Sequence, residues 1–246
     1  MTSAESRIYP GIARDRGTFG TPDPNDPARL IVTTSRPAPW TRQVSVYIPA
    51  GYTPGTVAPF IVGADGPDPL LFTVLDNLIA EKKAVPMIVV MPDCFTYYGG
   101  SQYINSTATG NYEDYLTREI VPFVDECFRT IVDRDFRAVM GKSSGGYGAL
   151  IMGLRHADLF GLVCSTAGDA YFELCYTGDF TKAFRIIKGD PNGFMKRFHA
   201  TEKQGKDDHS ALNVIGMSAC YSPNGTSFDL PFDMETGEIC QNVWSR

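Results

Sequence analysis

The sequence has little positive charge and no long apolar segment. Lys and Arg number 22 against 28 Asp and Glu, for a formal net charge of −6, and no basic run exceeds two residues. Because nucleic-acid-binding proteins normally carry a basic patch, we expect no nucleic-acid partner. No apolar stretch approaches the roughly 18 residues that a membrane-spanning helix needs, and the first residues lack the apolar segment of a secretory signal. We therefore expect a cytoplasmic protein with no membrane partner.

Patterns of metal ligands are also scarce. The chain has six cysteines and three histidines, and no pair of cysteines has C-x-x-C spacing. Zinc and thiol-redox sites depend on closely spaced ligands of these two types. The sequence therefore predicts neither a metal nor a cofactor.

What the sequence does contain is an alternation of strands and helices. Residues 59–64 and 86–91 are continuous apolar runs, as expected of strands buried on both faces. Helical spacing is clearest over 111–130, where Pro122 predicts a kink or a new first turn. This order of elements predicts a parallel sheet covered by helices on both sides. Residues 180–220 instead predict three helices with no strand between them.

The chain divides, on composition, into an arm and a domain. Residues 1–40 are rich in Pro, Gly, Asp and Arg and predict an extended arm. Residues 41–246 predict one α/β domain, a size ordinary for such a fold, with a helical insertion at about 175–220.

The most informative segment is residues 141–146, with the sequence GKSSGG, between a predicted strand and a predicted helix. A serine between glycines at such a corner is the arrangement called a nucleophile elbow. The turn strains the serine backbone, lifts its hydroxyl out of the sheet and leaves no room for side chains at the flanking positions. Ser143 is therefore the candidate nucleophile, and the Ser144 N–H would face the oxyanion of a tetrahedral intermediate. A structural glycine turn is the alternative.

Five segments together carry a family resemblance. They are Val46–Pro49, Asp65–Gly66, Val89–Asp93, Tyr112–Pro122 and Gly141–Ala149. In this order they resemble the putative-esterase family of α/β-hydrolases, which includes esterase D-like S-formylglutathione hydrolases, enterochelin esterases and mycolyltransferases. The resemblance covers roughly residues 40–170. It implies an α/β-hydrolase fold with a mostly parallel sheet, and a serine esterase that cleaves small-molecule esters or thioesters through an acyl-enzyme at Ser143.

The loop that supplies the second oxyanion donor departs from the family pattern. The family takes this N–H from the residues that follow the strand ending near Asp65. Here Pro67 stands directly after Gly66, and proline has no N–H to donate. Either Gly66 or Asp68 donates instead, or the loop is shifted.

The triad partners of Ser143 are harder to place. In these hydrolases the acid and then the histidine follow the serine, on loops after the last strands, and no strand is recognisable after residue 170. Asp169 is a candidate acid or, alternatively, a helix cap. His209 is a candidate base or part of a solvated helix start. His199 is expected on the surface of a helix, and His156 at the end of the helix after Ser143.

Two functions therefore remain open: a serine esterase, or a non-catalytic binding protein or inactive fragment that keeps the hydrolase fold. A strand at 161–166 would stand at the sheet edge and expose Leu162 and Val163, and Trp244 has no evident partner. We expect the chain to lack the C-terminal strands of a longer protein, whose missing part carries the acid and the histidine. The exposed edge also allows a homo-oligomer, unless the helices of 180–220 cover it.

Overall fold

The computed structural model describes residues 44–52, 60–63, 69–201 and 204–245, together with six short strands before residue 42. These strands form the two-stranded pairs β1–β6 (Thr2–Ser3, Trp40–Thr41), β2–β5 (Ile12–Ala13, Thr33–Thr34) and β3–β4 (Thr21–Asp23, Asp26–Ile31). The rest of the predicted arm lies outside the described residues.

The chain forms two compact units. Unit 1 comprises Met1–Ser3, Thr41–Cys94 and Glu113–Asp169, and unit 2 comprises Ala4–Trp40, Phe95–Tyr112 and Ala170–Arg246. In the described part of both units, no helix combines the length and the apolar character needed to cross a lipid bilayer.

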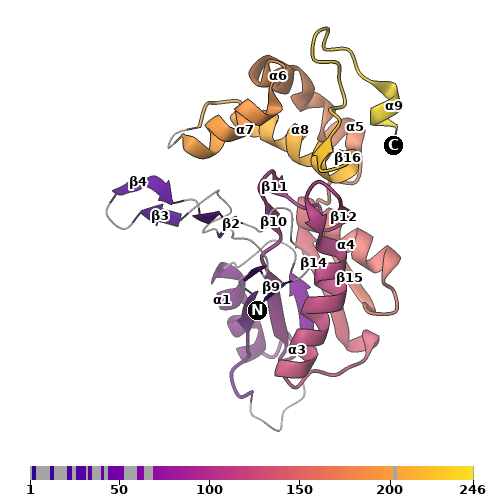
Figure 1. Ribbon diagram of the computed structural model, residues 1–246. Helices are drawn as coiled ribbons and strands as arrows, with labels where there is room; N and C mark the ends of the chain where they lie inside the picture. The colour runs from indigo at the N-terminus through magenta and orange to yellow at the C-terminus, as the bar shows by residue number, and fades with distance from the viewer. Residues whose placement is uncertain are drawn as a thin grey trace. The chain divides into compact units, whose positions relative to one another are not determined.

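Unit 1 is built on a five-stranded sheet with the strand order β15-β14-β8-β9-β7 (Figure 1). The strands are β7 (Val44–Tyr47), β8 (Phe60–Gly63), β9 (Ile88–Pro92), β14 (Arg137–Lys142) and β15 (Leu162–Thr166). Neighbours pair in parallel except β7, which runs antiparallel to β9. The expectation of an edge strand is confirmed for the described part of the sheet: β15 is last in the order, with Leu162 61% and Val163 45% exposed.

Helices cover both faces of this sheet. The helix α1 (Pro69–Ala80) packs Leu75 against Val89 and Met91 of the central strand β9. Val90, which lies between Val89 and Met91, points to the opposite face and is also fully buried. On that side Figure 1 shows α3 (Val121–Cys127) and α4 (Ser144–Arg155).

The helix predicted at 111–130 is present over residues 112–127 in three parts: α2 (Tyr112–Asp114), the π-helical segment η1 (Tyr115–Ile120) and α3. Pro122 lies in the first turn of α3. Of the two predictions for this proline, a kink or a new first turn, the new first turn is the one observed. Proline has no N–H to donate to the preceding turn, so the pattern of helical hydrogen bonds changes just before Pro122. The Val121 N–H accordingly bonds the Leu116 carbonyl, five residues back.

Unit 2 is mainly helical in its described part. Its helices are α5 (Phe172–Cys175), α6 (Thr177–Ile187), α7 (Pro191–Ala200), α8 (Asp208–Tyr221) and α9 (Gln241–Trp244). Besides the pairs β2–β5 and β3–β4, it contains the short hairpins β10–β11 (Phe95–Thr96, Gly99–Gly100), β12–β13 (Asn105–Ser106, Gly110–Asn111) and β16–β17 (Pro223–Asn224, Ser227–Phe228). The three helices predicted between 180 and 220 are therefore present.

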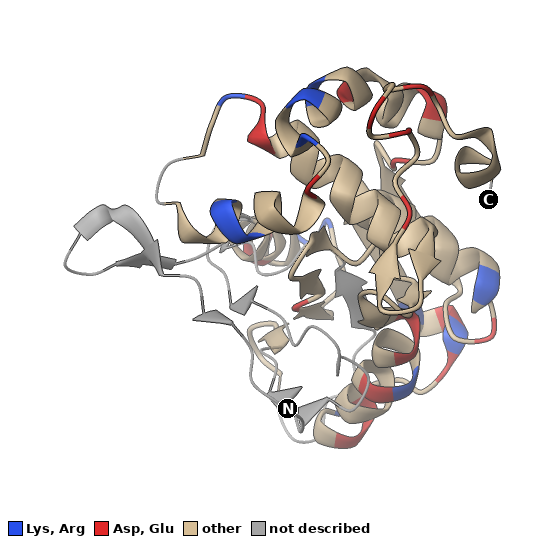
Figure 2. Ribbon diagram, turned by 45° about the horizontal axis from the view of Figure 1, so that its top comes forward, with Lys and Arg blue, Asp and Glu red and all other residues tan. Residues whose placement is uncertain are grey.

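The core of unit 2 surrounds α8, whose residues from Val214 to Cys220 are all buried. Figure 2 shows the reason: α8 is almost entirely uncharged, whereas acidic and basic residues are interspersed on the helices around it. Trp244 also packs here, edge-on to Phe180 with ring centroids 5.3 Å apart. The expectation that Trp244 lacks a partner is wrong, because α9 brings it onto α6.

Candidate active site

Ser143 occupies the turn between the end of β14 and the start of α4. Its backbone has φ 53° and ψ −122°, a combination that non-glycine residues rarely adopt and that costs on the order of 1–3 kcal/mol. The strain that the sequence predicts at this position is therefore present.

Hydrogen bonds from two neighbouring segments hold the strained residue. The Ser143 N–H donates to the Thr166 carbonyl at 2.9 Å, at the end of β15. The Ser143 carbonyl accepts from the N–H groups of Tyr147 at 3.0 Å and Asp169 at 3.4 Å. The turn is thus fixed both by its own helix and by the loop that follows the adjacent strand.

The glycines around Ser143 are required by close backbone approach. A Cβ at Gly141 would lie 2.2 Å from the Gly145 carbonyl oxygen, and a Cβ at Gly146 would lie 2.8 Å from the Cα of Gly168. Real Cβ contacts are essentially never this short. The predicted collision is therefore confirmed, because the first turn of α4 lies directly on the ends of β14 and β15.

The side chain of Ser143 is exposed, and its hydroxyl faces a carboxylate. The Oγ atom lies 3.3 and 3.4 Å from the two carboxylate oxygens of Asp169. Burial raises the pKa of Asp169, while hydrogen bonds from the side chains of Ser143 and Ser144 act in the opposite direction. The helix-cap interpretation of Asp169 is wrong: α5 is preceded by Tyr171 and has no side-chain cap.

Of the oxyanion donors predicted from the sequence, the structure describes the position of Ser144 only. Ser144 is the first residue of α4, where backbone N–H groups have no acceptor within the helix and the dipole favours negative charge. Gly66 and Asp68, like Pro67 between them, lie outside the described residues.

The three histidines belong to different surroundings. His156 ends α4, about 20 Å from Ser143 at 1.5 Å per residue. His199 is half-buried rather than on the surface: its Nε2 lies 2.9 Å from the Tyr97 carbonyl oxygen, and the two rings contact each other at a tilt of 31° with centroids 4.4 Å apart. His209 is exposed in the first turn of α8. His199 and His209 both belong to unit 2. Among the acid and base candidates, Asp169 is therefore the one that the described part of unit 1 places beside Ser143.

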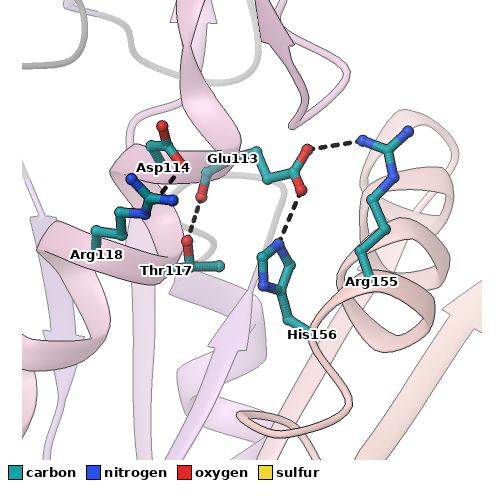
Figure 3. A network of polar contacts seen from close by, with 6 residues as sticks. All are labelled: Glu113, Asp114, Thr117, Arg118, Arg155 and His156. Carbon is teal, nitrogen blue, oxygen red and sulfur yellow. Dashed lines mark hydrogen bonds and ion pairs between the residues drawn. The ribbon is translucent and has the colours of Figure 1, made fainter.

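The far end of α4 carries a polar network that the sequence did not reveal as such. The Glu113 carboxylate, 12% exposed, accepts from Arg155 at 2.8 Å and contacts the His156 Nε2 at 2.8 Å (Figure 3). The Thr117 hydroxyl donates to the Glu113 carbonyl at 2.8 Å. The only sequence signal for this network was the position of Glu113 in the family segment 112–122.

The aromatic loop at residues 97–103 is largely part of the unit 2 core. Tyr98 and Tyr103 are buried, and Tyr98 packs edge-on to Phe228 at 5.2 Å. Within the described residues, no group of three or more His, Cys, Asp and Glu is placed to hold a metal ion.

Comparison with known proteins gives one family and several partial relatives. The family model described as "Putative esterase" matches residues 35–214. A protein of Xylanibacter ruminicola named endo-1,4-beta-xylanase/feruloyl esterase is 34% identical over 138 residues, covering 54% of this chain and 19% of that protein. An esterase of Mycobacterium tuberculosis is 32% identical over 144 residues, covering 53% and 30%. A solved ferulic acid esterase is 28% identical with a TM-score of 0.47, covering 52% and 53%. The match thus spans less than a third of the length of either of these sequence relatives.

Proposed function

The chain belongs to the "Putative esterase" family, and from this premise we propose that it hydrolyses carboxylic esters through an acyl-enzyme formed at Ser143. The observation that carries the proposal is the backbone of Ser143, a non-glycine residue held at φ 53° between a strand and a helix. Such strain persists only where surrounding contacts maintain it, and it clusters at active sites. The turn leaves the Ser143 hydroxyl exposed, where an ester can reach it.

The groups around Ser143 suit the steps of acyl transfer. The hydroxyl attacks the ester carbonyl carbon, and the oxyanion that forms lies near the start of α4, where the Ser144 N–H donates to it. Collapse releases the alcohol and leaves the acyl group on Ser143, after which water hydrolyses it. Family resemblance places the second donor in the loop that follows Asp65, where Gly66 and Asp68 are the candidates unless the loop is shifted. Asp169 and His209 are the candidates for proton transfer.

An activity-based probe tests this assignment directly. We expect a fluorophosphonate to label the full chain at one residue, and peptide mapping to place the adduct on Ser143. The Ser143→Ala variant loses the label, whereas the matched Ser144→Ala variant, which keeps the backbone N–H, retains an adduct on Ser143. An adduct on Ser144 or elsewhere in the wild type contradicts the proposal.

A non-catalytic binding protein is the second candidate. The observation in its favour is that, in the described part of unit 1, the Ser143 hydroxyl meets a carboxylate and no imidazole. Turnover of p-nitrophenyl acetate by the wild type and by Ser143→Ala separates the two functions. Equal turnover by both proteins supports the binding function, and turnover lost with Ser143 supports the esterase.

A further inference from the structure

Unit 2 contains the tripeptide Pro-Asn-Gly twice, in two different structures. Residues 191–193 form the first turn of α7, and residues 223–225 form β16 and the start of the turn that follows it. In this tripeptide the backbone nitrogen of the glycine can attack the side-chain amide of the asparagine, because glycine has no Cβ to obstruct the approach. Since the two tripeptides are identical, the surrounding structure decides which of them reacts.

At the first of these sites the attacking nitrogen is held in place. The Gly193 N–H donates to the Asp190 carboxylate at 2.8 Å, which caps α7. Phe194 and Met195, the next two residues, are each 1% exposed in the core of unit 2. The first turn of α7 therefore opens only by breaking a hydrogen bond to a charged group and exposing apolar side chains. The fold thus protects the Asn192 side chain from attack.

At the second site the asparagine and the glycine are exposed at the tip of a short hairpin. β16 and β17 contribute two residues each, and the pairing of Asn224 with Ser227 leaves Gly225 in the turn between them. Gly225 has φ +59°, and a Cβ at this position would meet nothing within 4 Å. Since hairpins this short open at little cost, the Gly225 nitrogen can reach the side chain of Asn224.

We propose that Asn224 is a site of spontaneous deamidation, and that its conversion loosens the β16–β17 hairpin. The Gly225 nitrogen bonds the side-chain carbon of Asn224, the bond to Nδ2 breaks, and Nδ2 leaves as ammonia after taking the Gly225 proton. Water then opens the cyclic succinimide at one of its carbonyls and gives aspartate or isoaspartate. The reaction consumes one water, releases one ammonia and needs no oxidant or reductant. This inference is independent of the proposed esterase function.

The carboxylate that forms faces one that is already there. In the asparagine form, the Asn224 Nδ2 donates to the Asp229 carboxylate at 3.0 Å. Conversion replaces this donor with a negative charge, so an attraction becomes a repulsion between like charges. Isoaspartate also adds a carbon to the main chain, which disturbs the pairing of β16 with β17. Because Phe228 of this hairpin packs against Tyr98, the loosening reaches the unit 2 core.

The first test follows deamidation at both sites in one protein. The folded chain is kept at mildly alkaline pH and its tryptic peptides are mapped by mass spectrometry at intervals, since cleavage at Lys196 and Lys206 places the two asparagines on different peptides. We expect Asn224 to convert at least about tenfold faster than Asn192, where a hydrogen bond to a charged group must break first. In denaturant the two rates should converge. Equal rates in the folded protein, or conversion of Asn224 only in denaturant, overturn the proposal.

The second test measures what conversion does to the hairpin. Asn224→Asp reproduces one product, and we expect hydrogen exchange of the backbone amides at residues 222–229 to become about two- to fivefold faster, as for an exposed pair of charges. Asn192→Asp is the matched control. It places a carboxylate in the first turn of α7, where the helix dipole favours negative charge, and should not speed exchange in that helix. Unchanged exchange at residues 222–229 in Asn224→Asp overturns the proposed loosening. Neither test depends on the reactivity of Ser143, so its result is separate from that of the esterase proposal.

Discussion

The two ends of α4 present the same kinds of group in opposite ways. At the start, Ser143 has a strained backbone, an exposed hydroxyl and contacts of 3.3 and 3.4 Å to the Asp169 carboxylate. At the end, the Glu113 carboxylate makes two contacts of 2.8 Å, to Arg155 and His156, and His156 has an unstrained φ of −126°.

The difference separates stability from reactivity along one helix. The Glu113 end holds short, charge-assisted hydrogen bonds of the kind that stabilise a fold. The Ser143 end keeps backbone strain and longer hydrogen bonds to Asp169, which stabilise the fold less but leave the hydroxyl exposed and able to react. We therefore expect substitutions at the Glu113 end to alter stability and substitutions at the Ser143 end to alter the rate of labelling.

Replacing Gly141 should have the largest effect, because it disturbs the reactive end through its backbone. In Gly141→Ala the new Cβ meets the Gly145 carbonyl at 2.2 Å, so the start of α4 must move. Overpacking costs about 1–3 kcal/mol, and a displacement of about 1 Å can slow a reaction by about 10²-fold. We expect both losses, measured by thermal melting and by labelling of Ser143.

The control for this change is Gly178→Ala in α6, where the new Cβ meets nothing within 4 Å. Alanine favours a helix over glycine by about 0.5–1 kcal/mol, so this variant should be slightly more stable. A Gly141→Ala protein labelled at the wild-type rate would show that the reactive end tolerates movement.

Breaking the Glu113 network should affect stability and spare reactivity. In Glu113→Ala, Arg155 and His156 lose a carboxylate that is 12% exposed. Hydrogen bonds to charged groups contribute about 1.5–3 kcal/mol, but Arg155 is 53% exposed and can turn to water. We therefore expect a loss of about 2 kcal/mol on denaturant unfolding, with labelling of Ser143 little changed.

Asp114→Ala provides the control on the neighbouring residue. Its partner Arg118 is 76% exposed at 3.2 Å (Figure 3), and such surface pairs contribute about 0.3–0.5 kcal/mol. If Glu113→Ala slowed the labelling of Ser143 as much as Gly141→Ala does, the two ends of α4 would be coupled.

These contrasts also explain what the sequence could reveal. The strained turn was predictable because glycine spacing beside a serine has a local steric cause, and the edge position of β15 followed from the absence of later strands. Asp169 could be proposed only as an acid or a cap, since its contact with Ser143 depends on how β15 places the loop beside β14. The Glu113 network was not predictable, because Glu113 and His156 are 43 residues apart and meet only through packing.

Relieving the strain at Ser143 should raise stability by a smaller amount. Glycine adopts positive φ without steric cost, so Ser143→Gly recovers strain of about 1–3 kcal/mol but loses about 0.5–1 kcal/mol to the freer unfolded chain. We expect a net gain of about 1 kcal/mol on unfolding. Ser144→Gly, one residue into α4, should instead lose about 0.5 kcal/mol. Equal losses in both variants would show that the Ser143 backbone carries no strain.

The smallest expected effect concerns the charge of Asp169, and it depends on pH. Because burial raises the pKa of this carboxyl, the folded protein binds its proton more tightly than the unfolded chain does. The free energy of unfolding therefore decreases as the pH rises from the ordinary value of 3.8 through the raised pKa. Asp169→Asn removes the charge, so its melting temperature should exceed that of the wild type at pH 7 and match it below pH ~3.8.

Asp233 offers the control of opposite sign. Backbone hydrogen bonds from Thr236 and Glu235 lower its pKa, so its charged form favours the folded state, and this contribution is lost as the pH falls through the lowered value. Asp233→Asn should accordingly melt below the wild type at pH 7, with the difference fading in acid. If Asp169→Asn also melts lower at pH 7, then the Asp169 charge stabilises the fold as Glu113 does. The two ends of α4 would then be alike in their electrostatics, and the strain at Ser143 would be the one remaining difference between them.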